Sequence, residues 1–387
     1  MIGEKMRTEL FYRISDYMFE VYRWVSSNGP APFEPKAPGL FVDVLEYQRL
    51  NHPMYAKYCE ISGCTQRGKS IFDYPPLPVE SFKRADLCPF EPDQVIAEFY
   101  SSGTTEQVRS IHKFRDMGLV QRANLFAFQM MVMRNTGKIP RIFSLMPSPQ
   151  DNPHSSLGFM ISQFVQNLGV KGSGYYFSMD GGLDVDGLCD AIAQAYRDEV
   201  PVHLMGPSFA YVHLLDALGD RTLQTVPGSC LLETGGYKGK SREVPKGELR
   251  DALSAKLGIA RRFIYGEYGM CELSSQGYEI CALNTSGDLP DEGLYIFPPW
   301  LKCVVFNPDD MSPTLPGNEG QIAFCDMCNL DSAAYILTGD VGTMVEIPGD
   351  LRKRIKGFPK FALKLRGRAA NAVPKGCSMA WDEWAQG

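Results

Sequence analysis

Apolar residues recur at a helical period from the start of the chain. Leu10, Phe11, Ile14, Met18 and Val21 are spaced so that one helix face is apolar, and charged residues lie between them. This pattern ends at the proline-rich run PPLPVESF. We therefore predict that residues 1–90 form a helical region packed on the core of the protein.

From residue 96 to residue 269, strand-like apolar runs alternate with helix-like runs. The strand candidates are RIFSLM, PVHLMG, GSCLLETGG and RRFIYGEYG, and the helix candidates are CDAIAQAYRDEV, SFAYVHLLDAL and KGELRDALSAKL. Such alternation favours a parallel sheet with helices on its faces. The predicted fold class is therefore α/β.

After Asp288 the helix-like runs give way to strand candidates separated by Gly, Pro, Asn and Asp. These candidates are GLYIFP, LKCVVFN, QIAFCDM, AAYIL, TMVEI and FALKLRG. They predict a small β subdomain that follows the α/β part. We place the α/β core with this subdomain at residues 91–340, and a short C-terminal segment with a mobile tail at residues 341–387.

Composition and charge narrow the class of protein. The chain is 44% hydrophobic and 22% charged, which is enough apolar material for a large core. The net charge of the chain is -6, which argues against the basic surface that nucleic-acid binding needs. No run of residues approaches the ~20 apolar residues of a membrane span. The eleven cysteines are scattered and do not form a secreted disulfide pattern, so we expect a cytoplasmic protein with reduced thiols.

Cys325 and Cys328 form a single CxxC pair. A structural zinc site normally takes four ligands, and no second pair lies at a suitable spacing. We therefore expect two ordinary cysteines here and no metal site.

The segment from Phe99 to Ser110 is the most specific local signal. It follows an apolar strand candidate and contains Ser101, Ser102, Gly103, Thr104 and Thr105, with Arg109 close behind. Hydroxyls, backbone N–H groups and a guanidinium in one loop are suited to hold phosphates. The alternative is an ordinary solvent-exposed turn.

A second glycine-rich segment, ETGGYKGKSRE, nearly matches a P-loop. Thr234 stands where the P-loop pattern needs its first glycine, so the loop is one residue too short. We interpret it as the end of a strand, where Gly235 and Gly236 let a flat base lie against the backbone.

Two acidic residues stand in places suited to a nucleotide site. Glu272 follows a strand candidate and a glycine, where a carboxylate can bridge a metal ion. Asp340 lies in LTGDVG, which we predict to be a turn, and its carboxylate can accept both hydroxyls of a ribose. Taken singly, each acid is equally typical of a cap or a turn.

The motifs SSGTT, YGxxE, TGD and GR, in this order, resemble the adenylate-forming superfamily of acyl-CoA synthetases, luciferases and peptide-synthetase adenylation domains. Within this superfamily, the chain resembles the LuxE-type acyl-protein synthetases of bacterial bioluminescence in five longer segments: PPLPVESFK, FYSSGTT, ETGGYKGKSRE, YGMCELSSQGY and GCSMA. This resemblance extends from about Pro75 to the end of the chain.

The resemblance implies an ATP- and Mg²⁺-dependent ligase that activates a carboxylic acid, here a fatty acid, as acyl-AMP. It implies transfer of the acyl group to Cys377, with Lys375 and Arg368 as further catalytic residues whose positive charge favours the thiolate, and then to a partner such as a reductase or carrier protein. It also implies nucleotide contacts by the SSGTT loop, Arg109, Gly235, Gly236, Tyr268, Gly269, Asp340 and Arg368, and a metal contact by Glu272.

The chain departs from the superfamily pattern in three places. Glu106 replaces a common glycine of the phosphate loop, and Cys271 replaces the threonine of YGxTE. Full acyl-CoA synthetases continue after the GR motif with a mobile domain that supplies a catalytic lysine, whereas 387 − 368 = 19 residues follow Arg368 here. LuxE-type chains share this short end, which favours transfer to a protein thiol.

Alternatives remain open from the sequence. One is a ligase that passes an aryl or amino acid to CoA or a carrier protein, and another is a non-catalytic nucleotide-binding scaffold. The acid itself is not determined by the sequence. An acyl channel and ordinary core packing both account for the apolar residues Phe159, Met160, Phe164, Met205 and Phe209.

Overall fold

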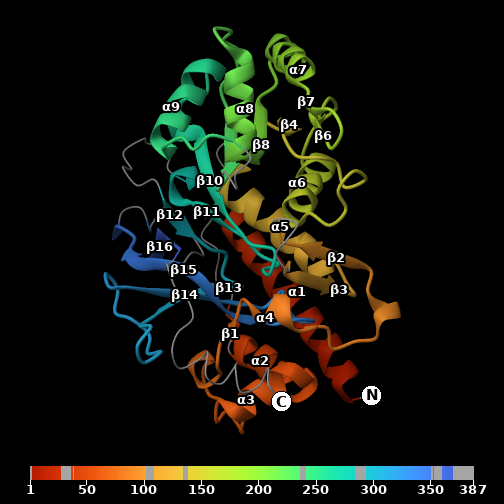
Figure 1. The fold of residues 1–387 in the computed structure, drawn as a ribbon, viewed down its shortest axis with the longest axis vertical. Helices are drawn as coiled ribbons and strands as arrows, with labels where there is room; N and C mark the ends of the chain where they lie inside the picture. Colours follow the sequence, from red (N-terminus) through yellow and green to blue (C-terminus); the bar gives the residue numbers. More distant parts are fainter. Residues whose placement is uncertain are drawn as a thin grey trace. The chain divides into compact units, whose positions relative to one another are not determined.

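The computed structural model divides into two compact units, which we describe separately (Figure 1). Unit 1 comprises Met1–Phe126, Met270–Gln276 and Gly293–Gly387, and unit 2 comprises Ala127–Gly269 and Gly277–Glu292. The structure describes residues 2–27, 36–37, 39–101, 109–133, 138–235, 241–283, 293–349, 352 and 360–368. The predicted domain boundaries at residues 90 and 340 stay predictions.

Helices dominate the beginning of unit 1, as predicted. They are α1 (Ile2–Ser26), α2 (Leu40–Asn51), α3 (Pro53–Ile61) and α4 (Ser81–Arg84), with single 3₁₀ turns at η1 (Ile71–Asp73) and η2 (Pro92–Gln94). The apolar face of α1 is buried, since Leu10, Ile14, Met18 and Val21 are each at most 1% exposed. Within the described residues, no helix is both long and apolar enough to cross a membrane.

The later part of unit 1 is an antiparallel sheet. Its strand order is β13-β14-β15-β16-β12, and β1 pairs in parallel with β15. The bounds are β1 (Leu77–Pro78), β12 (Leu294–Ile296), β13 (Leu301–Phe306), β14 (Glu319–Asp326), β15 (Tyr335–Glu346) and β16 (Phe361–Arg368). The predicted strands after Asp288 are therefore confirmed as a β region.

The predicted turn at LTGDVG is wrong. AAYIL and TMVEI belong to the single strand β15, and Asp340 lies inside it opposite Arg368 of β16. The pairing of β15 with β16 shifts register between Val341 and Gly342, and β15 continues through this point as one strand. A Cβ atom on Gly342 would lie 2.9 Å from the Lys364 carbonyl oxygen, so this glycine serves close strand packing.

A short hairpin and a long helix complete the chain before unit 2. Strands β2 (Ala97–Tyr100) and β3 (Ile111–Phe114) pair antiparallel. Helix α5 (Gly118–Met131) then carries the chain from unit 1 into unit 2.

Unit 2 contains the predicted parallel sheet. Its strand order is β11-β10-β9-β8-β4-β5, and all of these strands are parallel except β11, which pairs antiparallel with β10. The bounds are β4 (Arg141–Ser144), β5 (Gly174–Tyr175), β8 (Val202–Pro207), β9 (Cys230–Thr234), β10 (Ile264–Tyr268) and β11 (Gly277–Glu279). Every residue of β8, β9 and β10 is buried, as is typical of central parallel strands.

Four helices of unit 2 accompany this sheet. They are α6 (Ser156–Asn167), α7 (Val185–Arg197), α8 (Ser208–Leu218) and α9 (Lys246–Leu257), with a small hairpin of β6 (Phe177–Ser178) and β7 (Gly182–Leu183) and the turns η4 (Arg261–Phe263) and η5 (Ile280–Leu283). Helices α8 and α9 have the predicted bounds. Leu249, Leu253 and Leu257 of α9 are at most 1% exposed and join the core of this unit.

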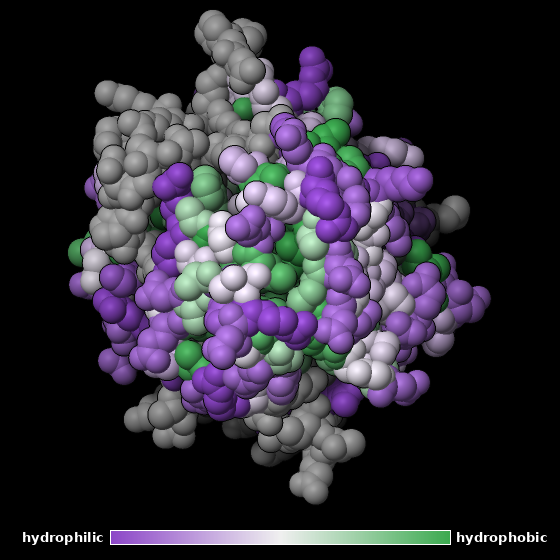
Figure 2. Space-filling model, turned by 90° about the horizontal axis from the view of Figure 1, so that it is seen from above, coloured by the Kyte–Doolittle hydropathy of each residue, from purple (hydrophilic) through white to green (hydrophobic). Residues whose placement is uncertain are grey.

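Figure 2 shows how hydrophilic and hydrophobic residues are distributed on one face of the protein. Seen from above, the protein is mostly hydrophilic, and apolar side chains gather toward the centre of the face (Figure 2). The α/β fold class is confirmed.

His203 in β8 is a buried titratable group in the core of unit 2. Its side chain is 0% exposed, and its ring lies edge-on to Phe128 with centroids 6.1 Å apart. Burial lowers the pKa of His203 from 6.5 to about 4, although a backbone group of Gly228 acts in the opposite direction. The imidazole is therefore neutral in the folded protein at neutral pH.

We predict that His203 makes the protein sensitive to mild acid. The unfolded chain binds a proton below about pH 6.5, whereas the folded protein does so only near pH 4, so stability falls as the pH decreases through this window. This one group should remove about 2 kcal/mol between pH 7 and pH 5. Urea unfolding of the parent and of His203→Leu at both pH values measures it, with the exposed His213→Leu as control. Equal acid sensitivity of the parent and His203→Leu would contradict the assignment.

Candidate active site

The two ends of the predicted phosphate loop lie side by side in unit 1. The Ser101 amide donates to the Ser110 carbonyl oxygen at 3.0 Å, and the Ser110 amide donates to the Ser101 hydroxyl oxygen at 2.9 Å. Strands β2 and β3 therefore present Ser101 and Arg109 at the base of the loop, where Arg109 is exposed. The other predicted loop residues, Ser102, Gly103, Thr104 and Thr105, lie outside the described residues, as does Glu106.

Glu272 is a buried carboxylate in the segment Met270–Gln276 of unit 1. It is 6% exposed, and no cation pairs with it in the part of the chain that the structure describes. Burial raises the pKa of the Glu272 carboxyl, while the nearby Ser110 hydroxyl and the charges of Lys83 and Arg368 act against this rise. A buried carboxyl group without a paired cation lowers the stability of the folded protein, and such groups are common at binding and catalytic sites.

The segment that carries Glu272 also contains a buried hydroxyl group. The buried hydroxyl of Ser274 has no hydrogen-bond partner among the described residues. Carboxylate and hydroxyl oxygens are the hard ligands that Mg²⁺ prefers, often with phosphate oxygens of a nucleotide. The described residues contain no group of three or more His, Cys, Asp or Glu that could hold a metal by themselves, so any cation here would need ligand oxygens from elsewhere.

Asp340 and Arg368 are neighbours across strands β15 and β16. Arg368 Nε lies 3.5 Å from Asp340 Oδ1, and the two residues are partners in the strand register. The Arg368 side chain is 89% exposed and that of Asp340 21%, so this pair contributes at most ~1 kcal/mol to stability. The structure thus brings the predicted ribose residue Asp340 together with the predicted catalytic residue Arg368, whose side chain is open to solvent.

The predicted base-binding residues lie at the carboxyl edge of the parallel sheet in unit 2. Thr234 of β9 pairs with Glu267 of β10, so Gly235 and Tyr268 follow at adjacent strand ends, with Gly269 next. Ligands of open α/β sheets bind at this edge. A Cβ atom on Gly235 would meet nothing within 4 Å, which leaves its face open, whereas Gly236 lies outside the described residues.

A buried ion cluster that the sequence did not predict supports these strand ends. Arg250 of α9 is 0% exposed, and its Nη2 lies 2.7 Å from Glu233 Oε1 while its Nη1 lies 2.8 Å from Glu279 Oε2. Lys246 Nζ reaches Glu279 Oε1 at 2.6 Å. The amide of Gly266 also donates to Glu279 at 2.7 Å, so β9, β10 and β11 meet at this cluster.

The cluster holds the carboxyl of Glu279 in the ionised form. Burial opposes ionisation of Glu279, but the charges of Arg250 and Lys246 outweigh it and lower the pKa of Glu279 to about 2. The two carboxylates of Glu233 and Glu279 are thereby compensated by two cations, Arg250 and Lys246. The sequence signal was present only as Arg250 beside the apolar positions Leu249 and Leu253 of a predicted helix.

The CxxC cysteines are part of the unit 1 core. Cys325 is 1% exposed and Cys328 6%, and Cys328 Sγ lies 3.7 Å from Met18 Sδ of α1. Burial raises the pKa of both thiols well above the usual range. Each therefore behaves as a small apolar residue.

The apolar residues considered for an acyl channel are mostly core residues of unit 2. Met160, Phe164 and Met205 are at most 5% exposed, and Phe164 stacks on Phe128 with centroids 4.1 Å apart. Phe159 and Phe209 are half-buried. This packing accounts for the first three without a ligand.

The tail residues Cys377 and Lys375 lie outside the described residues. Their predicted roles stay predictions. Cys271, which departs from the YGxTE pattern, is buried, and its carbonyl oxygen lies 3.0 Å from Nδ1 of His112.

Comparison with known proteins supports the fold. No protein-family model and no curated protein sequence matches this chain. Among solved structures, an open conformation of 2-hydroxyisobutyryl-CoA ligase with 2-HIB-AMP and CoA aligns with a TM-score of 0.55 at 13% identity, over 86% of this chain and 74% of that chain. The same ligase in its postadenylation state with R3-HIB-AMP aligns with a TM-score of 0.58 at 13% identity, over 86% and 67%. The chain therefore has the α/β fold found in adenylate-forming ligases.

Proposed function

We propose that this protein is an ATP-dependent ligase that activates a carboxylic acid as its acyl-AMP. The observation that carries the proposal is Glu272, a buried carboxylate with no cationic partner among the described residues, close to the base of a Ser/Thr/Gly loop. Similarity of fold to a ligase that binds an acyl-AMP is consistent with it. The reduced cysteines and acidic charge are consistent with action in the cytoplasm on small molecules and proteins.

In the proposed reaction the substrate carboxylate attacks the α-phosphate of ATP and pyrophosphate leaves. Arg109 and the Ser101 end of the loop would bind the phosphates, and Asp340 would orient the ribose from β15. Gly235 and Tyr268 would border the base at the edge of the sheet. Mg²⁺ held with the help of Glu272 would neutralise phosphate charge, which is the chemistry that this cofactor supplies.

Acid-dependent exchange of pyrophosphate into ATP tests this proposal. A panel of fatty, short aliphatic, aryl and amino acids would be offered to the purified protein with Mg²⁺. Exchange with at least one acid class is expected, and the class identifies the substrate. Absence of exchange with every acid would favour the non-catalytic scaffold, for which Glu106 and Cys271 are the motivating departures.

We further propose that the acyl group moves to Cys377 and from there to a partner protein, as the LuxE-type resemblance implies. Cys377 lies nine positions after Arg368, a distance along the chain that can span at most ~30 Å when extended. Gly376 would act as a pivot, and Lys375 would favour the attacking thiolate. The thiolate would form a thioester as AMP leaves.

Intact-mass measurement after incubation with ATP and an accepted acid tests this second step. We expect Cys377→Ala to keep pyrophosphate exchange and to lose a hydroxylamine-sensitive acyl adduct that the parent shows. Cys64→Ala, at a half-buried cysteine, is the control and should retain the adduct. An adduct that survives Cys377→Ala would refute the carrier role.

A CoA ligase acting on an aryl or amino acid is the competing proposal. It is favoured by the fold similarity to a ligase that binds CoA together with an acyl-AMP. Acyl-CoA formation on addition of CoA, with no acylation of the protein itself, would select it.

Asp340→Ala tests the ribose assignment. Loss of two carboxylate hydrogen bonds to the ribose should raise the KM for ATP by about 10- to 100-fold, from ~1.5–3 kcal/mol of charge-assisted bonding. The KM for the acid should change little, because Asp340 is assigned away from the acyl group. Exchange kinetics with ATP and acid varied in turn measure both constants. A changed acid preference at unchanged ATP affinity would contradict the assignment.

A further inference from the structure

The segment that carries Glu272 receives many of its hydrogen bonds from one loop, Asp326–Ser332, which joins β14 to β15. Asp326 is 0% exposed, and its Oδ2 accepts from the amides of Ser274 and Ser275 at 3.1 and 2.8 Å. Its Oδ1 accepts from the Ser275 hydroxyl and the Cys328 amide, both at 2.9 Å. One carboxylate thus fixes two consecutive peptide units of the Glu272 segment.

Asn329 binds the same segment at Glu272 itself. Its Nδ2 donates to the Glu272 carbonyl oxygen at 2.7 Å and to the Ala333 carbonyl oxygen at 2.9 Å. Its Oδ1 accepts from the Ser274 amide at 2.9 Å. Asn329 is 1% exposed, so these bonds are made without competition from water.

His112 of β3 connects the segment to the other end of the loop. Its Nδ1 lies 3.0 Å from the Cys271 carbonyl oxygen and its Nε2 lies 2.8 Å from the Ser332 hydroxyl. Burial lowers the pKa of His112 to about 4, so the ring is neutral and can donate with one nitrogen and accept with the other.

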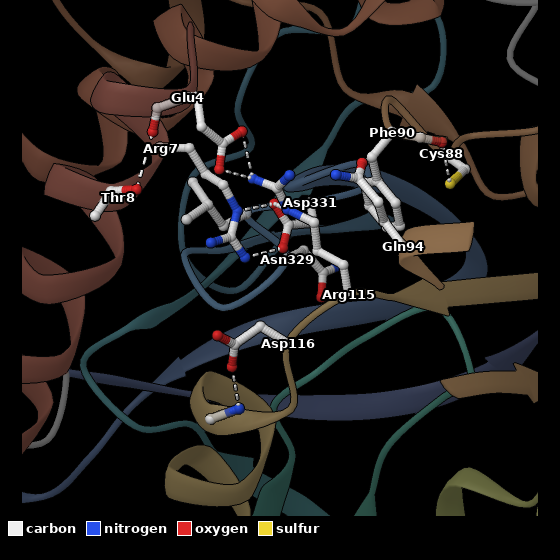
Figure 3. Close-up of polar contacts among 12 residues, drawn as sticks. Glu4, Arg7, Thr8, Cys88, Phe90, Gln94, Arg115, Asp116, Asn329 and Asp331 are labelled. Atoms are coloured by element: carbon white, nitrogen blue, oxygen red, sulfur yellow. Dashed lines mark hydrogen bonds and ion pairs between the residues drawn. The ribbon is translucent and has the colours of Figure 1, made fainter. Parts of the chain in front are cut away.

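The N-terminal helices hold the loop from its other side. Gln48 of α2 is 0% exposed, donates to the carbonyl oxygens of Asn329 and Leu330 at 2.7 and 3.2 Å, and accepts from the Ala334 amide at 2.9 Å. Arg7 of α1 makes a two-bond ion pair with Asp331 (Figure 3).

Arg115 adds a second cation to this ion pair. Its Nε lies 3.7 Å from Asp331 Oδ1, and its Nη2 donates to Glu4 of α1 at 2.8 Å (Figure 3). The loop is thereby fixed by side chains far away in the sequence.

We propose that the loop Asp326–Ser332 is a positioning element for Glu272, with Asp326 and Asn329 as positioning residues. This inference rests on the proposed function for its catalytic consequence. The Glu272 segment has no regular secondary structure beyond isolated turns. The side chains of Asp326 and Asn329 therefore supply the hydrogen bonds to its backbone that a strand or helix would otherwise supply. Groups behind a metal or phosphate ligand typically change affinity or activity by ~10- to 100-fold when they are removed.

The test combines hydrogen exchange with kinetics in Asp326→Asn, which keeps the shape but replaces an acceptor oxygen by an amide. Without any ligand, we expect amide hydrogen exchange in residues 270–276 to become at least about 10-fold faster than in the parent. We expect kcat for pyrophosphate exchange to fall by ~10- to 100-fold with little change in the acid KM. Ser229→Ala, which removes a buried hydroxyl bond to Val202 in unit 2, is the control and should change neither readout.

A double-mutant comparison decides whether the loop acts through Glu272. In a Glu272→Gln background, adding Asp326→Asn should lower the residual rate by no more than about 2-fold. A full 10- to 100-fold loss in that background, or unchanged hydrogen exchange at residues 270–276, would overturn the proposal. If Asp326→Asn does not fold, Ser275→Ala removes one of the same bonds and is judged by the same criteria.

The two proposals fail in different ways. A parent protein that shows no pyrophosphate exchange with any acid would overturn the proposed function and the catalytic part of this inference. Hydrogen exchange in Asp326→Asn reports on the positioning of the segment independently of that outcome.

Discussion

Replacement of Glu272 by alanine or glutamine is expected to reduce acid-dependent pyrophosphate exchange by roughly 10²- to 10³-fold, the size of one lost electrostatic contact in a preorganised site. The same variants should be no less stable than the parent. Burial raises the pKa of Glu272, so ionisation of this carboxyl is less favourable in the folded state than in the unfolded chain, and a neutral side chain relieves that cost. Loss of activity with retained or increased stability separates a functional acid from a structural one.

Initial exchange rates and thermal unfolding of both variants measure these effects. The matched control is Glu248→Gln, at an acid in the first turn of α9, which should alter neither quantity by more than about 2-fold or ~0.5 kcal/mol. Near-parental exchange in a folded Glu272→Ala would remove this residue from the site. A large loss of stability in Glu272→Gln would instead indicate a structural role.

Arg250→Met is expected to cost about 3–5 kcal/mol of stability, the typical cost of breaking a buried ion pair from one side. The substitution leaves Glu233 and Glu279 buried, with Lys246 as the remaining cation close to both. Urea unfolding at pH 7 measures the loss. Arg261→Met, which breaks the more exposed pair with Asp251, should cost less than ~1 kcal/mol.

Two further outcomes test the origin of this cost. Replacing both acids by glutamine in the Arg250→Met background should restore much of the stability, because no buried carboxylate is then left uncompensated and the remaining cation, Lys246, is partly exposed. The pKa of Glu279 lies at about 2 in the folded state against an ordinary 4.5, so its stabilisation is complete above pH 4.5 and is lost as the pH falls toward 2. A parent protein with no such loss over that range would contradict the assignment.

The periodicity of the sequence determined most of the elements. Helices α8 and α9 were predicted with their bounds, because each places apolar residues at helical spacing between turn residues. The parallel strands of unit 2 were predicted because buried central strands are continuous apolar runs. These features depend on neighbours within one turn or one strand, and the sequence displays such neighbours directly.

Strand β15 shows where local patterns mislead. Gly and Asp in TGDVG are typical of a turn, but the pairing of β15 with β16 keeps the chain extended through Asp340. The glycine at position 342, which is typical of a turn, is explained instead by a register shift between the strands and by the close approach of Gly342 to its neighbours. Pairing with a strand distant in the sequence outweighed the local preference.

The sequence by itself determined which residue types are available for nucleotide chemistry and in what order they occur: Ser101, Arg109, Glu272, Asp340 and Arg368. The tertiary structure alone decided that Glu272 is buried without a paired cation in the described residues, that Asp326 and Asn329 bind its segment, and that Gln48 binds the loop that carries them. Those bonds join residues up to 281 positions apart, and Arg250 meets its two acids only through the packing of α9 on the sheet. Burial and long-range hydrogen bonding are properties of the folded chain, so they cannot be predicted from the local spacing of residues in the sequence.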